Sequence, residues 1–476
     1  MGPLSRLVAA WRRVGFSGLV GDLRWRVRTA LGGSGVAAIP SRSIRIVRAG
    51  GITAIAQRAR YAAHQVRHPS IEEPEVVAIE EAPPHPWLQT AAHMVSFVPY
   101  FDLANADLEA NAAVVARFND RPSPVRTATW FLPFFHHALF GGVHTILRLM
   151  DYMTREHGVE HRIVIHDPEE GDRELRAKIS DVFPALGSVD LVLVHGGNVP
   201  YDELPHTDIA VCTLWTTAFA LAKFNDVDAK FYMVQDFEPA FYPAGSMYGL
   251  TEATYRLGFA GIVNTPGLAE IYSTYGNPTV AFTPSFSVAT DLYPKPSEKP
   301  GEPVQIVLYG RPSVDRNAFE LVASACVHLK NVYGDGIRII SAGEEFDPNE
   351  LGLGGIIENH GLLDSLEDVQ ELYRNSDIGI CFMFSRHPSY QPFEYLAAGV
   401  APVANVNAAT SWFLKDEENC LIVEPFPSSI AEGVGRLIDD PELRREIADR
   451  GHDEVALGDW PTEFARVWDF VNGSSS

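Results

Sequence analysis

The chain has 476 residues, more than one ordinary hydrophobic core holds, so we expect two domains and an extension. Hydrophobic residues make up 46% of it and charged residues 21%, a composition that excludes disordered and fibrous proteins. The four cysteines lie far apart and form no CxxC pair. The sequence therefore predicts reduced thiols of a cytosolic protein, with neither a disulfide framework nor a zinc site.

The net charge of −23 is distributed unevenly along the chain. Residues 1–70 contain arginines but no lysine, with Asp22 as the one acid, while the rest of the chain is strongly acidic. The arginines alternate with Trp, Phe, Ile and Leu at helical spacing, which favours a helical extension lying on an anionic membrane surface. A solvated basic arm, a packing helix and a nucleic-acid contact fit the same pattern. Because the acidic body would repel phosphates, we expect no nucleic-acid partner.

The apolar stretches of the chain are too short or too interrupted to cross a bilayer. The longest, residues 128–150, contains proline, histidines and glycines. The apolar run at 7–10 is too short for a secretory signal. We therefore expect a cytoplasmic protein, peripheral on the inner membrane face. Residues 71–90, rich in Pro and Glu, are expected to be a linker.

From residue 91 the sequence alternates β-rich runs with helical stretches, which is typical of parallel sheets covered by helices. We expect two Rossmann-like α/β domains, 91–290 and 291–476, with a boundary in the Pro-, Lys- and Glu-rich segment 292–303. Open α/β sheets bind ligands at the carboxyl ends of their strands, so the site is expected in a cleft between the domains. The expected strands are 129–135, 162–166, 191–195, 209–213, 231–235, 261–264, 305–309, 337–341, 378–384 and 401–404.

Helical periodicity predicts three further elements. The apolar positions of 143–156 fall on one helical face. A helix at 319–333 is expected to bury Phe319, Val322, Cys326, Leu329 and Val332. The last helix, 460–470, has an aromatic face and is expected to cross back onto the first domain.

A short loop after the first strand of the second domain carries two arginines. Gly310 lets the backbone approach a ligand closely, and Arg311 and Arg316 would form a clamp for a diphosphate. Such a clamp also stabilises the charge that grows on a departing diphosphate. A surface loop with an Arg–Asp pair through Asp315 fits these residues equally well.

A second loop, residues 384–391, is rich in hydrogen-bonding groups and precedes a helix that is expected to begin near Pro392. Free N–H groups in such a first turn bind phosphate oxygens. Glu394 would accept both hydroxyls of a ribose. The alternative is that Glu394 is simply a favourable charge at a helix N-terminus.

Several motifs agree in order and spacing with one known family. They are Gly-Arg at 310–311 with Arg316, His-Gly at 360–361, Asp377 before a strand, and the runs 392–403 and 419–423. Together they resemble the donor half of retaining glycosyltransferase family 4, which has the GT-B fold. His-Pro-Ser-Tyr-x-Pro at 387–392 and Gln-Asp-x-Glu-Pro-x-Phe-Tyr-Pro at 235–243 make the chain most similar to bacterial rhamnosyltransferases of S-layer and cell-wall polysaccharide assembly. The resemblance covers roughly residues 125–470.

Carried across by position, the resemblance implies roles for single residues. Arg311 corresponds to the arginine that neutralises the donor diphosphate, and Arg316 stands where the family usually has a lysine. Glu394 corresponds to the second glutamate of the E-x7-E signature, which binds the donor ribose. Gly142, with Gly141, resembles a glycine pair that lets donor or acceptor approach the backbone.

One position departs from the family pattern. Arg386 stands where the first glutamate of the signature, eight residues before Glu394, is expected. In the family that glutamate is thought to contact the transferred sugar, so the departure implies a different sugar, such as L-rhamnose. His387, Ser389 and Tyr390 are then expected to line the sugar pocket.

The acceptor side is expected at the end of a buried strand in the first domain. Gln235, Asp236 and Glu238 would point into the cleft there, with Asp236 positioning or deprotonating an acceptor hydroxyl. A helix cap at the strand end is the alternative. The Asp-x-Asp motif at 226–228 is interpreted as solvated surface.

The sequence thus predicts a glycosyltransferase that moves L-rhamnose from dTDP-rhamnose onto a lipid-linked cell-surface polysaccharide, with retention and with neither cofactor nor metal. Its expected partners are a nucleotide sugar, a glycan or glycolipid acceptor and an anionic membrane surface. One alternative is a transferase that uses a UDP- or GDP-sugar. Another is a membrane-docked scaffold with a degenerate donor site.

Overall fold

The computed structural model describes residues 97–121, 123–138, 141–285, 303–363, 365–455 and 459–473. The basic segment 1–70, the linker 71–90 and the domain boundary at 290/291 lie outside these residues. Among the described residues, no helix is both long and apolar enough to cross a membrane.

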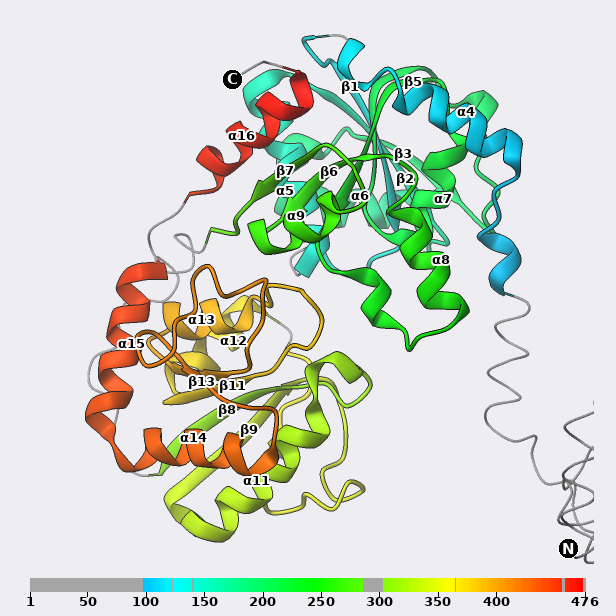
Figure 1. Ribbon diagram of the computed structural model, residues 1–476. Helices are drawn as coiled ribbons and strands as arrows, with labels where there is room; N and C mark the ends of the chain where they lie inside the picture. The colour runs from blue at the N-terminus through cyan, green and yellow to red at the C-terminus, as the bar shows by residue number, and fades with distance from the viewer. Residues whose placement is uncertain are drawn as a thin grey trace, which may run out of the picture. The chain divides into compact units, whose positions relative to one another are not determined.

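The first domain is built on seven parallel strands in the order β3-β2-β1-β4-β5-β6-β7 (Figure 1). The strands are β1 Thr127–Pro133, β2 Glu160–His166, β3 Asp190–Val194, β4 Thr207–Cys212, β5 Val227–Val234, β6 Ala260–Asn264 and β7 Thr279–Phe282. The helices are α4 Asn105–Val115, α5 Gly141–His157, α6 Asp172–Val182, α7 Trp215–Lys223, α8 Ser246–Thr254 and α9 Pro266–Ser273. The six expected strands are confirmed; the short edge strand β7 was not predicted.

The second domain is built on six parallel strands in the order β10-β9-β8-β11-β12-β13. The strands are β8 Val304–Gly310, β9 Ile337–Gly343, β10 Glu358–Asn359, β11 Ile378–Cys381, β12 Ala401–Ala404 and β13 Leu421–Ile422. The helices are α11 Phe319–Tyr333, α12 Leu366–Arg374, α13 Gln391–Ala397, α14 Pro427–Asp439 and α15 Pro441–Val455. The four expected strands are confirmed, while the two-residue strands β10 and β13 carry too few residues to show a periodicity.

In both sheets, the order in which successive strands are added reverses once. In the first, the chain adds β2 and β3 on one side of β1 and then β4 on the other; in the second, β9 and β10 lie on one side of β8 and β11 on the other. This is the doubly wound Rossmann arrangement. The two predicted Rossmann-like domains are therefore confirmed. The switch points of the sheets lie between β1 and β4 and between β8 and β11, which is where such sheets bind ligands.

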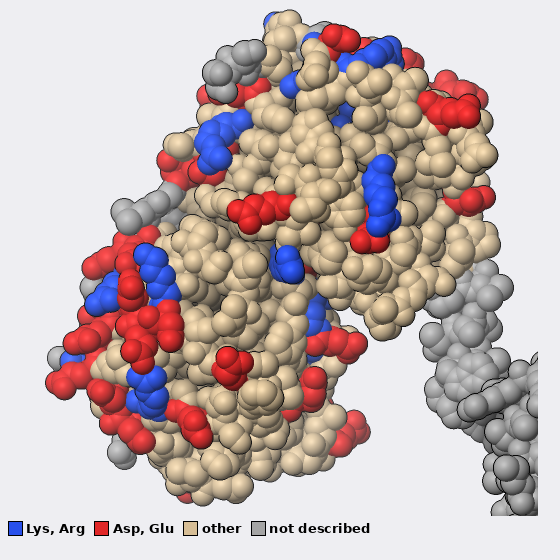
Figure 2. All heavy atoms as spheres, viewed as in Figure 1, with Lys and Arg blue, Asp and Glu red and all other residues tan. Residues whose placement is uncertain are grey.

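Acidic side chains are prominent on the surface. Figure 2 shows them spread over the face that it draws, including the side formed by α14 and α15. This distribution agrees with the excess of 61 Asp and Glu over 38 Lys and Arg in the whole chain. A negatively charged substrate therefore depends on local cations for its binding.

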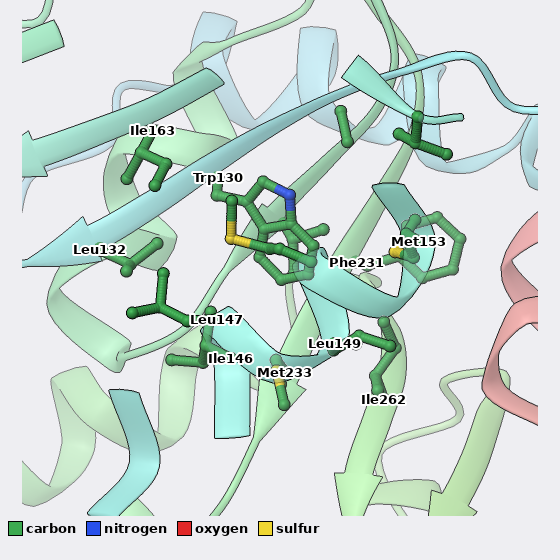
Figure 3. Packing of buried hydrophobic residues seen from close by; sticks show 14 of the residues in the cluster. Trp130, Leu132, Ile146, Leu147, Leu149, Met153, Ile163, Phe231, Met233 and Ile262 are labelled. Carbon is green, nitrogen blue, oxygen red and sulfur yellow. The ribbon is translucent and has the colours of Figure 1, made fainter. Parts of the chain in front are cut away.

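The amphipathic helices cover the sheets as their periodicity predicts. Ile146, Leu149 and Met153 of α5 are buried and pack with Trp130 of β1 and Phe231 of β5 (Figure 3).

One burial prediction is wrong. Of the five α11 residues expected to be buried, Val332 is 61% exposed. The apolar stripe that runs through Val322, Cys326 and Leu329 continues at Tyr333, which packs against the core in place of Val332.

The last helix, α16 Trp460–Asn472, packs on the first domain although it follows the second in sequence (Figure 1). Phe464, Val467 and Trp468 belong to the same buried cluster as α5. The guanidinium of Arg148 in α5 lies 4.8 Å from the ring centroid of Trp460. The core of the first domain is thus completed by the C-terminal segment.

Candidate functional site

Two loops flank the switch point of the second sheet. Residues 311–318 follow β8 and residues 382–390 follow β11. The backbone N–H of Phe384 donates to the carbonyl oxygen of Arg316 at 2.9 Å, so the two loops are tied together. Five of the expected site residues lie in these loops, at the place where a doubly wound sheet binds its ligand: Arg311, Arg316, His387, Ser389 and Tyr390.

The two arginines lie near each other, but each lies over a different aromatic ring. The guanidinium of Arg311 is 5.7 Å from the ring centroid of Tyr309, and that of Arg316 is 4.8 Å from the ring centroid of Phe241. Burial and the positive charge of Arg311 lower the pKa of Arg316, whereas Asp236 opposes the shift. Two neighbouring guanidiniums repel each other, so an anion bound between them would be stabilised. The alternative Arg–Asp315 ion pair does not occur among the described residues.

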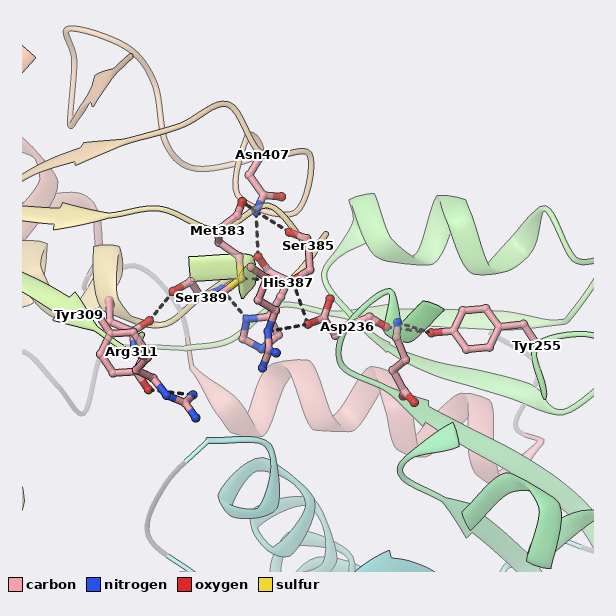
Figure 4. Close-up of polar contacts among 12 residues, drawn as sticks. Asp236, Tyr255, Tyr309, Arg311, Met383, Ser385, His387, Ser389 and Asn407 are labelled. Carbon is pink, nitrogen blue, oxygen red and sulfur yellow. Dashed lines mark hydrogen bonds and ion pairs between the residues drawn. The ribbon is translucent and has the colours of Figure 1, made fainter. Parts of the chain in front are cut away.

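Asp236 brings the end of β5 in the first domain into contact with the second domain (Figure 4). Its Oδ2 accepts a hydrogen bond from Oγ of Ser385 at 3.0 Å and lies 3.9 Å from Nε of Arg316. Burial raises the pKa of Asp236 to about 6, against the opposing effects of Arg316 and Ser385. Its Oδ1 is buried and has no partner among the described residues. The carboxylate therefore keeps one acceptor atom for another group.

A single amide fixes the loop after β11. Nδ2 of Asn407 donates to the carbonyl oxygens of Met383, Ser385 and His387 at 3.2, 3.0 and 3.1 Å (Figure 4). Within the loop, Nδ1 of His387 accepts from the N–H of Ser389 at 2.9 Å. Burial and the neighbouring Arg316 lower the pKa of His387 to about 4, so its ring stays neutral and Nδ1 remains an acceptor. Asn407 was missed by the sequence analysis because it follows a different strand, β12.

Glu394 lies in the first turn of α13, where the predicted helix start near Pro392 is confirmed. Its N–H donates to the carbonyl oxygen of Tyr390 at 3.0 Å. Burial raises the pKa of its carboxyl to about 7. Among the described residues no side chain or backbone group bonds to this carboxyl group. A partly exposed acceptor without a partner at a helix N-terminus is suited to binding hydroxyl groups.

The two site glycines differ in how closely the protein surrounds them. A Cβ on Gly142 would lie 2.8 Å from Nε2 of Gln235, whose amide donates to the Gly142 carbonyl oxygen at 3.1 Å, but only the tip of this flexible side chain would have to move. A Cβ on Gly310 would collide with the hydroxyl of Ser341 and lie 3.1 Å from its Cβ, on the neighbouring strand. Gln235 therefore joins the end of β5 to the start of α5, and packing restricts Gly310 more than Gly142.

The orientation predicted for Glu238 is wrong. Its side chain is 2% exposed, and its Oε2 accepts from the N–H of Trp215 at 2.5 Å and from the hydroxyl of Tyr232 at 3.0 Å. It therefore points into the core of the first domain. In an extended strand it would lie on the same side as Asp236, but the strand ends at Val234 and a 3-10 helix begins at Glu238.

The Asp-x-Asp motif lies at the amino end of β5, opposite the end that carries Asp236. Nδ1 of His206 lies 3.0 Å from Asp226 and its Nε2 lies 3.1 Å from Asp228, so both carboxylates have a partner. His206, Asp208 and Asp228 are close enough together to share a cation, but His206 is bonded at both nitrogens. Exposed groups of this kind occur commonly in proteins without a metal.

Comparison with known proteins identifies the two domains. Residues 131–264 match the family "WsaF, N-terminal domain" and residues 304–435 match "WsaF, C-terminal domain". The two matches together cover more than half of the chain and include the site residues on both domains. The chain belongs to the WsaF family.

Two curated relatives of this WsaF-family chain are named for O-antigen biosynthesis and for lipopolysaccharide core biosynthesis. The O-antigen biosynthesis protein RfbC of Myxococcus xanthus is 36% identical over 381 residues, which are 79% of this chain and 29% of RfbC. The lipopolysaccharide core biosynthesis glycosyltransferase LpsE of Rhizobium meliloti is 26% identical over 219 residues, 42% of this chain and 60% of LpsE. The chain thus spans less than two thirds of the length of either relative.

Solved structures agree on the fold. HepE of Anabaena, crystallised with UDP and glucose, has a TM-score of 0.52 at 13% identity and covers 71% of this chain and 96% of its own. A glycosyltransferase from Rickettsia africae has a TM-score of 0.51 at 13% identity and covers 74% of this chain and 100% of its own. The WsaF-family chain therefore has the GT-B fold of glycosyltransferases.

The core position of Glu238 predicts a pH dependence of stability. Burial raises the pKa of its carboxyl from 4.5 to about 8, so between these values the folded protein holds a proton that the unfolded chain releases. The free energy of unfolding then falls as pH rises through this window, by at most about 1.4 kcal/mol per pH unit. Glu238→Gln keeps an oxygen acceptor but does not titrate. Its stability should therefore rise relative to wild type between about pH 5 and about pH 8.

Urea unfolding at the two pH values measures this difference. Glu109→Gln, which replaces an exposed glutamate of α4, serves as the control and should follow the wild type. If the Glu238 and Glu109 variants both follow the wild type, the carboxylate of Glu238 is not in the core.

Proposed function

We propose that this protein is a retaining glycosyltransferase that transfers L-rhamnose from dTDP-L-rhamnose to a growing, lipid-linked cell-surface polysaccharide. The observation that carries the proposal is the group at the switch point of the second sheet. Arg311 and Arg316 lie close together there, and the Glu394 carboxylate, in the first turn of α13, has no partner within the part of the chain that the structure describes. Two cations suit the diphosphate, and the carboxylate suits the 3′-hydroxyl of the donor's deoxyribose, which has no 2′-hydroxyl.

The reaction breaks the bond between the anomeric carbon and the diphosphate oxygen and forms a bond from that carbon to an acceptor oxygen. The two arginines stabilise the negative charge that develops on the departing diphosphate. The acceptor hydroxyl gives up its proton to the departing phosphate, so no protein nucleophile is needed. Asp236, whose Oδ1 has no partner among the described residues, positions the acceptor hydroxyl. The mechanism uses no metal and no cofactor.

The names of two relatives support a polysaccharide as the product of this enzyme. The names of RfbC and LpsE refer to O-antigen and to lipopolysaccharide core biosynthesis. The rhamnose donor follows from the His-Pro-Ser-Tyr-x-Pro motif at 387–392 and from Arg386 in place of the family's first glutamate. A uridine diphosphate sugar is the second candidate donor, because HepE was crystallised with UDP. The similarity of the chain to HepE is one of fold alone.

A lipid-linked acceptor would also explain why residues 1–70 are rich in arginine. A lipid-linked acceptor lies at a membrane surface, and arginines interleaved with aromatic and aliphatic residues bind anionic lipid headgroups. We therefore propose that residues 1–70 hold the enzyme on the inner membrane face.

A donor panel tests the proposed function. The purified 476-residue chain is incubated with dTDP-rhamnose, GDP-mannose, UDP-glucose and UDP-N-acetylglucosamine, and release of nucleoside diphosphate is measured. We expect selective turnover of dTDP-rhamnose. Arg311→Ala and Glu394→Ala should each lower this turnover about 100-fold or more, because each removes a group that binds the donor or its developing charge.

The control for the panel is Asp226→Ala, which removes a carboxylate at the opposite end of the sheet and should leave turnover unchanged. Turnover of a uridine or guanosine donor instead would change the donor assignment but keep the transferase. Full activity of Glu394→Ala would remove this carboxylate from the donor site. Donor binding without turnover would favour the scaffold.

Deletion of residues 1–70 tests the membrane proposal. The 476-residue chain should sediment with vesicles that contain anionic phospholipid, and less of it should sediment as salt is added, because the contact is electrostatic. The truncated protein should stay in the supernatant. Equal sedimentation of both proteins would show that the arginine-rich segment is not the anchor.

A further inference from the structure

The hydroxyl of Tyr390 reaches from the second domain to two elements of the first. It lies 3.0 Å from Oγ1 of Thr145, in α5, and 3.4 Å from Nδ2 of Asn264, the last residue of β6. Thr145 and Asn264 are 1% and 0% exposed. Since Nδ2 of Asn264 donates to the phenol oxygen, the phenol O–H can donate to Thr145.

The loop that carries Tyr390 has a strained backbone. Ser389 has a φ of 43°, in the left-handed region that residues other than glycine rarely adopt. Such a conformation persists only where several contacts enforce it. Before Ser389, Asn407 bonds the carbonyl oxygens of Ser385 and His387. After it, the hydroxyl of Tyr390 contacts Thr145.

Asn264 occupies a position that packing does not explain. The next residue, Thr265, has a φ of 79°, which is unfavourable for a β-branched side chain. Oδ1 of Asn264 is buried and has no partner among the described residues. A buried amide with an unsatisfied oxygen beside a strained backbone destabilises the fold, and such features gather at functional sites.

The position of Tyr390 is also coupled to the proposed donor site. Its carbonyl oxygen accepts from the N–H of Glu394, so a displacement of Tyr390 displaces the first turn of α13. Thr145 belongs to the same helix as Gly142, which Gln235 contacts. The phenol therefore connects α5 and β6 of the first domain to the loop and helix that present His387 and Glu394.

We propose that Thr145 and Asn264 are positioning residues, which act through the hydroxyl of Tyr390 to hold the 387–390 loop and the start of α13 in the geometry that binds the nucleotide-sugar donor. This inference rests on the proposed function. It assigns to the first domain a part in donor affinity, in addition to the acceptor side. Neither residue contacts the reacting atoms.

Substitutions that remove one hydroxyl each test the proposal. Thr145→Val and Tyr390→Phe keep the side-chain shape but lose the hydrogen bond. Each should raise the KM for the donor by at least about 5-fold and leave kcat within about twofold. Thr145→Val removes one hydrogen bond from ground-state positioning, whereas Tyr390→Phe removes the bonds to both Thr145 and Asn264. Thr145→Ser keeps the hydroxyl and should restore the wild-type KM. The double variant should be no worse than Tyr390→Phe alone, because both changes remove the same contact.

The matched control is Thr154→Val on the same helix, whose hydroxyl bonds only within the first domain, to the carbonyl oxygen of Val159. It should leave the KM unchanged. Thermal unfolding of every variant shows whether the fold is retained. Multiplying losses in the double variant, or an unchanged KM in Thr145→Val, would overturn the proposal.

Calorimetry with thymidine diphosphate alone separates this inference from the proposed function. If the wild type turns over no donor, the transferase assignment fails, but weaker thymidine diphosphate binding by Thr145→Val than by Thr145→Ser would still support positioning. Equal binding by the two variants would contradict it.

Discussion

The contact among Asp236, Ser385 and Arg316 is the interaction on which the site depends. It joins a carboxylate that follows β5 of one sheet to groups that follow β8 and β11 of the other. Burial alone would make this carboxylate unfavourable as an anion, and the guanidinium and the hydroxyl offset part of that cost. Because the partners come from different domains, the contact forms only when the carboxyl ends of the two sheets meet.

The strand order explains why these residues meet. Each sheet has a switch point beside its first strand. In the second sheet, the loops that follow β8 and β11 carry the two arginines and His387, and the second of these loops leads into the helix that bears Glu394. The chain as a whole is strongly acidic, so a diphosphate depends on local cations for its binding. The second domain's sheet brings Arg311 and Arg316 together at its switch point.

Much of this arrangement could be predicted from the sequence, because runs of apolar residues mark buried strands and Pro392 marks a helix start. The side-chain directions at the ends of strands could not. Glu238 is two residues from Asp236, yet the turn after Val234 sends it into the core. Asn407, Thr145 and Asn264 lie far in sequence from the loop they hold, and the strained backbones of Ser389 and Thr265 leave no mark in residue type.

We propose that Arg311, Arg316 and Glu394 form the donor site at the switch point of the second sheet. A crystal structure of the 476-residue chain with thymidine diphosphate shows directly where the nucleotide binds. We expect the diphosphate oxygens within hydrogen-bond distance of both guanidiniums and the sugar hydroxyl at the Glu394 carboxylate. A nucleotide bound elsewhere, or bound here without contact to either arginine, would contradict the account.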